Sequence, residues 1–254
     1  MFMAIGVALT ALAHMWPAPF VIDWMAGERA VWSMPRTGVP TVYLTFDDGP
    51  NPSTTPDLLD VLAAERTSAT FFIIDEHLNE QTAPIVRRAF TDGHAVALHS
   101  ATRRPMVTTP AQLGRMLRAA SARIEQLAGG TPCRAFRPHA GWRSGQMYEG
   151  LRELDYQLIG FGWMLWDFNW FRPRSADSSF RRIAGRVSDG DIIVMHDGDE
   201  SAPTRDQRHT VDATRRLIPE LRTRGFTFGT ICRMPAPQFA ISTRRRQDAK
   251  ELQR

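Results

Sequence analysis

The chain has 254 residues, of which 43% are hydrophobic and 23% charged. It can therefore bury one core of about 200 to 250 residues, which excludes a peptide-scale scaffold and a disordered chain. The formal charge of +4 is concentrated in an Arg-rich tail after residue 240, so the body is nearly neutral. All but one of the 31 basic residues are Arg, and no RNA- or DNA-binding motif accompanies them, which argues against nucleic-acid binding.

The first 22 residues contain no Asp, Glu, Lys or Arg, and the first 13 are almost wholly apolar. Thirteen helical residues span about 20 Å, less than the roughly 30 Å hydrocarbon core of a bilayer. We expect residues 1–22 to be a signal peptide or a membrane anchor, with an apolar helix packed on the domain as the alternative. This places the protein outside the cytoplasm, either secreted or membrane-anchored. Residues 23–38 read as a linker, 39–232 as the folded domain, and 233–254 as a basic, disordered tail.

From Val42 onward, short apolar runs alternate with longer amphipathic segments, the pattern of β/α units. Strands are expected at 41–46, 69–74, 95–98, 135–137, 157–160, 191–195 and 227–231. Helices are expected after Thr55-Pro56, at 83–92, from Thr109-Pro110 to Gly129, and at 144–154, 178–187 and 210–224. No phosphate-binding glycine fingerprint follows the first strand, so about seven parallel strands predict a deformed (β/α) barrel rather than a doubly wound sheet.

Two cysteines, Cys133 and Cys232, are too few for a disulfide framework, and their spacing fits no zinc motif. They could pair in an oxidising compartment, but we expect buried free thiols.

Polar residues follow five of the predicted strands. These residues are Asp47-Asp48-Gly49-Pro50, His99-Ser100, Arg137-Pro138-His139, Asp167 and His196-Asp197. In a barrel of this kind, reacting groups gather at the carboxyl ends of the strands, so we expect one shared site. Adjacent carboxylates repel each other unless a cation or a shared proton compensates them, and a bound metal would do so. An Asx-turn that uses only one Asp is the structural alternative.

These residues make the chain resemble the polysaccharide deacetylase family, the NodB-homology domain of the carbohydrate esterases, over about residues 39–232. Thr-Phe-Asp-Asp-Gly-Pro is similar to the first family motif, Asp-Gly-His with the following His-Ser to the second, Arg-Pro to the third, and Ile-Val-Met-His-Asp to the fifth. The resemblance implies a hydrolase that removes acetyl groups from N-acetylated sugars of a polysaccharide or oligosaccharide. It also implies a divalent metal such as zinc as the cofactor.

Carried over by position, the resemblance implies that Asp47 is the general base and that Asp48 and His99 are metal ligands. Arg137 would orient Asp47, and His196 would be the general acid. A catalytically inactive carbohydrate-binding module on the same fold is the alternative function. Hydrolysis of a small linear or cyclic amide is a third hypothesis.

The second motif departs from the family pattern, because Arg103 stands where a second ligating histidine is usual. A guanidinium has no lone pair to offer a metal. His139 or Asp197 could complete the metal site, or Arg103 could pair with Asp48 as a substituted cation. Loss of catalysis with retained sugar binding is the third outcome. We favour the first two because the proposed acid and base are both present.

The fourth motif also departs, because Asn169 replaces the usual Asp before Trp170. Asp167, two positions earlier, could take over the contact with Arg137. Aromatic residues crowd this segment, and we expect about half of them to be core packing. The candidate substrate-binding residues are Pro138, Trp142, Trp170 and Arg103.

Overall fold

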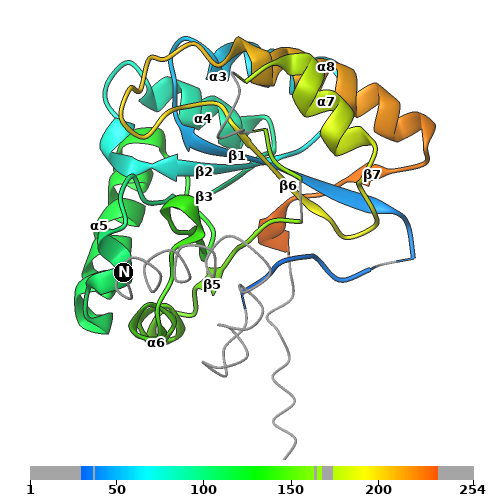
Figure 1. Ribbon diagram of the computed structural model, residues 1–254. Coiled ribbons are helices and arrows are strands. Elements are labelled where there is room, and N and C mark those ends of the chain that lie inside the picture. Colours follow the sequence, from blue (N-terminus) through cyan, green and yellow to red (C-terminus); the bar gives the residue numbers. More distant parts are fainter. Residues whose placement is uncertain (1–29, 37, 163–164, 168–173, 234–254) are drawn as a thin grey trace, which may run out of the picture.

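The described strands form one parallel sheet with helices packed along it (Figure 1). The computed structural model describes residues 30–36, 38–162, 165–167 and 174–233. The strands are β1 (Thr41–Gly49), β2 (Thr70–Ile74), β3 (Ala95–His99), β4 (Ala135–Arg137), β5 (Gln157–Leu158), β6 (Ile192–His196) and β7 (Thr227–Phe228). The helices are α3 (Thr55–Ala64), α4 (Ala83–Thr91), α5 (Pro110–Ala128), α6 (Gly145–Glu153), α7 (Ala176–Ala184) and α8 (Arg208–Thr223). Short 3-10 turns are η1 (Asp75–His77), η2 (Arg104–Val107), η3 (His139–Gly141) and η4 (Ile231–Arg233).

Each predicted strand and helix is present, with ends shifted by a few residues. Helix α7 begins earlier than predicted because the Ser175 hydroxyl accepts a hydrogen bond from the Ser178 backbone N–H and caps it. Strand β1 runs further than predicted and includes Asp47 and Asp48.

The sheet curls into a deformed barrel, as expected. Its order is β5-β4-β3-β2-β1-β6, and β7 pairs with the beginning of β1. Isolated bridges connect the two edge strands through irregular segments. They join Val31 to Ile159, Ser33 to Asp191, and Trp166 to Val194. Closure is therefore made by short irregular segments between β5 and β6.

The amino-terminal boundary of the folded unit differs from the expectation. Ala30 and Met34 are buried, and Val31 and Ser33 make bridges to the barrel, so residues 30–34 belong to the fold rather than to a linker. The expected leader at 1–22 lies outside the described residues, as does the basic tail from residue 234. None of the described helices is both long enough and apolar enough to cross a membrane.

Alternate residues of β1 face two different layers. Val42, Leu44 and Phe46 are fully buried in the larger core with the helices, of which α3, α4, α7 and α8 lie along one side of the sheet (Figure 1). Tyr43 belongs instead to the smaller core inside the barrel. By the same alternation Thr45 and Asp47 lie on the inner face. The inner core is thus apolar at the start of the strands and polar at their carboxyl ends.

Cys133 and Cys232 form a disulfide, with Cα atoms 5.7 Å apart, so the expectation of free thiols is wrong. The sheet brings them together although they are 99 residues apart in sequence. The Cys133 N–H donates to the Val96 carbonyl in β3, and the Ile231 N–H donates to Thr70 Oγ1 in neighbouring β2. Local sequence patterns do not predict a pairing between residues so far apart in the chain.

Removing this disulfide is expected to destabilise the fold. Because the bond closes a long loop, Cys232→Ser should lower the free energy of unfolding by about 2–4 kcal/mol, measured by urea denaturation. Wild type with reductant should show the same loss. A loss below about 0.5 kcal/mol in both experiments would contradict a stabilising role.

Candidate active site

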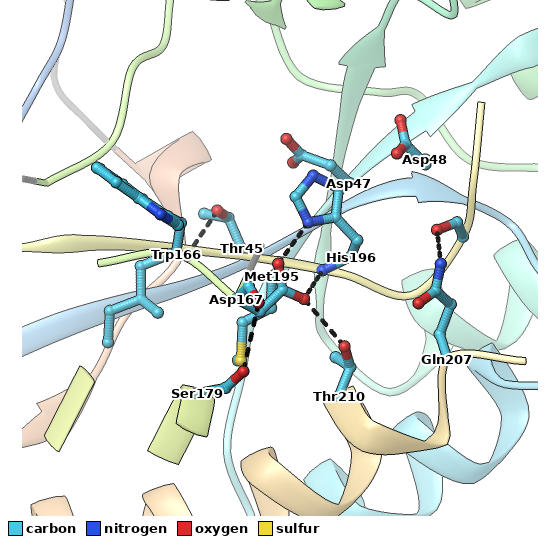
Figure 2. A network of polar contacts seen from close by, with 12 residues as sticks. Thr45, Asp47, Asp48, Trp166, Asp167, Ser179, Met195, His196, Gln207 and Thr210 are labelled. Atoms are coloured by element: carbon cyan, nitrogen blue, oxygen red, sulfur yellow. Dashed lines mark hydrogen bonds and ion pairs between the residues drawn. The ribbon is translucent and has the colours of Figure 1, made fainter. Parts of the chain in front are cut away.

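The carboxyl ends of the strands bring the predicted catalytic residues to one rim. In the parallel register Asp47 of β1 lies opposite His196 of β6, and His99 of β3 lies opposite Arg137 of β4. Strand β2 separates these two pairs and holds them in one sheet. Figure 2 shows the side chains of Asp47, Asp48 and His196 near one another. One substrate can therefore reach both the proposed base and the proposed acid.

Arg137 holds Asp47 through a buried ion pair. Its Nη1 lies 2.6 Å from Asp47 Oδ1 and also donates to Thr45 Oγ1 at 2.7 Å. Its Nη2 donates to the Gly160 carbonyl at 3.0 Å, and the guanidinium stacks 4.0 Å from the centre of the Phe72 ring. Burial lowers the pKa of Arg137, but an arginine still carries its charge at neutral pH. The ion pair therefore compensates the Asp47 charge and fixes the direction of its carboxylate.

Asp48 turns away from Asp47 and toward His99. Its backbone has φ of 69°, and the register shift between Asp47 and Gly49 marks a bulge that re-aims this side chain. Asp48 Oδ1 lies 3.2 Å from His99 Nε2. Burial by itself would raise the pKa of Asp48, but the neighbouring His99 holds it well below its ordinary value. Burial would lower the pKa of His99, and the charges of Asp47 and Asp48 raise it instead.

Asp48 and His99 fit two ligands of one divalent ion. Two donor atoms about 2.1 Å from a tetrahedral ion are about 3.4 Å apart, close to the observed 3.2 Å. The contact lacks hydrogen-bond geometry, so Asp48 Oδ1 has no hydrogen-bond partner among the described residues, and neither has buried His99 Nδ1. Within those residues no three His, Cys, Asp or Glu side chains converge as a ligand set. The pair therefore offers two donors, one fewer than the three protein ligands usual in a catalytic zinc site.

Arg103 does not complete the site. It is exposed, and its guanidinium lies 4.9 Å from the centre of the Trp142 ring. Across the described ranges no ion pair joins it to Asp48, so the substituted cation that we considered is not formed. His139 is half-buried and lies near enough to be affected by His99, which together with burial lowers its pKa.

His196 is held by a buried carboxylate. Its Nδ1–H donates to Asp167 Oδ1 at 2.6 Å, and its backbone N–H donates to Asp167 Oδ2 at 2.8 Å (Figure 2). Thr210 Oγ1 donates to the same Oδ2 at 3.0 Å. Burial would lower the pKa of His196, but Asp167 raises it to about 9. Burial would raise the pKa of Asp167, and His196 lowers it instead. The raised pKa of His196 favours its protonated form at neutral pH.

The position of Asp167 corrects the expectation that it contacts Arg137. Every side-chain hydrogen bond of Arg137 in the described structure goes elsewhere, to Asp47, Thr45 and two backbone carbonyls after β5. The bridge between Trp166 and Val194 places this segment against β6, so Asp167 meets His196. Asn169 and Trp170 lie outside the described residues.

A buried polar network beneath the two carboxylates escaped the sequence reasoning. Thr55 Oγ1 donates to Asp197 Oδ2. Gln207, labelled in Figure 2, donates from Nε2 to the Gly198 carbonyl at 2.7 Å. A Cβ atom at Gly49 would lie 2.6 Å from Asp197 Oδ2. Burial raises the pKa of Asp197 to about 7. Asp197 therefore supports the loop after β1. Thr55 was read only as the start of a helix, so no local signal pointed to this contact.

Replacing Asp167 tests the charge of His196. Asp167→Asn removes the main cause of the raised pKa, so the His196 titration should fall from about 9 toward about 6.5. If the reaction needs protonated His196, the rate of the variant should fall as the pH rises above about 6.5. The rate of wild type should fall only as the pH approaches about 9. NMR titration and pH–rate profiles measure both. Asp212→Asn, an exposed carboxylate on α8, is the control. An unchanged His196 titration in Asp167→Asn would refute the assignment.

Replacing Arg103 tests the incomplete metal site. Arg103→His supplies an imidazole where the family motif has one, and should tighten Co²⁺ binding at least about tenfold, since even outer-shell partners change metal affinity by that much. Calorimetry and the visible spectrum of bound Co²⁺ provide readouts independent of activity. Thr102→His, one residue earlier, is the control. Equal affinity in wild type and Arg103→His would mean that another residue already completes the ligand set.

Comparisons with known proteins agree with this geometry. A family model described as polysaccharide deacetylase matches residues 35–159. A chitooligosaccharide deacetylase from Sinorhizobium fredii is 37% identical over 205 residues, which cover 76% of this chain and 92% of the relative.

Two solved structures are also similar. A peptidoglycan N-acetylglucosamine deacetylase superposes with a TM-score of 0.69 at 27% identity, covering 82% of this chain and 94% of that one. A family 4 acetyl xylan esterase from Clostridium thermocellum, determined with a cobalt ion, superposes with a TM-score of 0.65 at 31% identity, covering 75% of this chain and 88% of that one. The chain, with its paired carboxylates and histidines on the rim of a deformed barrel, belongs to the polysaccharide deacetylase family.

Proposed function

We propose that this protein hydrolyses the acetamide group of N-acetylated sugars in an oligosaccharide or polysaccharide, releasing acetate and a free amine. The observation that carries the proposal is the register pairing of Asp47 with His196. Each is held by a buried partner of opposite charge, Arg137 for the carboxylate and Asp167 for the imidazolium. The relatives named above, which act on chitooligosaccharide and on peptidoglycan N-acetylglucosamine, support the same substrate class.

Asp47 and His196 would divide the proton transfers of the reaction. Asp47 accepts a proton from the water that attacks the acetyl carbonyl carbon, because Arg137 keeps its carboxylate turned into the site. His196 carries a proton on Nε2, since Nδ1 is engaged by Asp167. It donates that proton to the departing nitrogen as the carbon–nitrogen bond breaks. Its positive charge also stabilises the negative oxygen that develops during attack.

Asp48 and His99 would hold a divalent metal ion, for which zinc is our candidate. When bound, such an ion would polarise the acetyl carbonyl and make the attacking water more acidic. His139 is our candidate for a third ligand, because its backbone N–H donates to Ser100 Oγ at 3.0 Å and keeps η3 beside the end of β3.

Pro138 and Trp142 follow Arg137 at the same rim and are proposed to line the sugar-binding surface. Pyranose rings pack against aromatic faces, and Trp142 is only partly buried. The disulfide between Cys133 and Cys232 supports an oxidising compartment outside the cytoplasm, because such bonds are rare in the reducing cytosol.

Acetate release from N-acetylated chito-oligosaccharide or peptidoglycan fragments tests this proposal. Asp47→Asn removes the base while keeping the shape, so the rate should fall by about 10²–10⁴-fold, the usual contribution of a general base. Asp60→Asn, which changes an exposed carboxylate on α3, should retain wild-type activity. Equal acetate release by wild type and Asp47→Asn across several substrates would favour the carbohydrate-binding module instead.

A further inference from the structure

The segment that follows the second motif carries arginines but no acidic residue. Residues 102–122 contain four arginines, at 103, 104, 115 and 118, and no Asp or Glu. Other arginines pair with carboxylates, as Arg88 does with Asp60 and Arg222 with Glu65. For these four, no ion pair is formed within the described residues. Among the described residues, the positive charge of this surface is therefore not compensated by a carboxylate.

Two of these arginines line a depression. Its volume is about 230 Å³, and it lies between η2 and the first turns of α5. The lining residues are Arg104, Thr108, Gln112, Arg115 and Met116. Arg104 and Arg115 are both exposed, and neither forms an ion pair within the described ranges, so their guanidinium groups can turn into the depression. An arginine fork matches a carboxylate in shape and charge.

The depression is connected to the carboxyl end of β3, because η2 follows shortly after His99 in the chain. Arg103 directly precedes η2 and its guanidinium lies over the Trp142 ring, so the start of η2 stands beside the proposed sugar-binding surface. Ser144 Oγ donates to the Met106 carbonyl at 2.7 Å and ties η2 to the beginning of α6. A glycan bound across Trp142 would therefore reach Arg103, which directly precedes Arg104 of the depression.

We propose that Arg104 and Arg115 form a subsite for a carboxylate carried by a sugar that neighbours the deacetylated residue. The inference rests on the proposed function and narrows its substrate to acidic N-acetylated glycans, as opposed to neutral ones. Arg104 and Arg115 would bind the carboxylate, and Met116 offers an apolar surface to the substituent that carries it.

A matched pair of glycans tests this subsite. The first is a peptide-free peptidoglycan tetrasaccharide, in which every second sugar carries a lactyl carboxylate, and the second is the same tetrasaccharide with its carboxylates converted to methyl amides. The full chain should bind the acid about three- to tenfold more tightly, measured by calorimetry, as expected for charge-assisted contacts at an exposed site. This preference should shrink as salt is raised.

Two sets of variants separate the depression from general positive charge. Arg104→Gln with Arg115→Gln should abolish the preference for the acid. Arg118→Gln removes the same charge from α5 but does not line the depression, and should keep the preference. Equal affinity of wild type for both glycans would overturn the subsite, as would an equal effect of Arg118→Gln.

Acetate release from the same two glycans distinguishes this inference from the proposed function. If both glycans are deacetylated and bind with equal affinity, the proposed function is supported and the subsite is refuted. If the acidic glycan binds more tightly but neither glycan releases acetate, the subsite is supported and the proposed deacetylase function is refuted.

Discussion

The buried ion pair between Arg137 and Asp47 is the interaction on which the arrangement of the site depends. Both side chains are almost completely removed from solvent, and burying either charge alone would cost several kcal/mol. The pair is tolerable because Arg137 also bonds Thr45 and two carbonyls after β5, and because Phe72 lies against its guanidinium. These contacts connect β1, β2, β4 and β5. The carboxylate that we propose as the base is thus positioned by contacts that run across the sheet.

The opposite side of the site repeats this design with the signs reversed. His196 is the proposed cation of the site, and Asp167 is the buried carboxylate that holds it. Two groups of opposite charge can therefore stand on adjacent strands, each with its own buried partner, without neutralising each other. A base that must be ionised and an acid that must be protonated coexist at the same pH because each environment favours a different protonation state. Asp48 and His99 lie beside them as a separate pair.

Sequence reasoning identified the strands, the barrel and the residues at the strand ends, because hydrophobic periodicity and the order of polar strand ends are local signals. It could not assign partners across the barrel. Asp167 was matched to Arg137 by motif order, whereas the fold places it on His196 through the bridge between Trp166 and Val194. The disulfide and the use of residues 30–34 in barrel closure depend on contacts between distant segments. Whether Arg103 faces Asp48 was likewise undecidable until the position of Trp142 was known.

Gly49 and Gly198 have a role that chemistry alone would not assign to them. A side chain on Gly49 would collide with Asp197, and one on Gly198 would collide with the Asp48 backbone. The end of β1 and the residues just after β6 can approach each other this closely only where both positions lack a side chain. In a comparison of related sequences these positions should vary as little as the reacting residues do. The two glycines would then be invariant because a side chain does not fit there. Counting every invariant residue as a substrate contact would therefore give too many contacts.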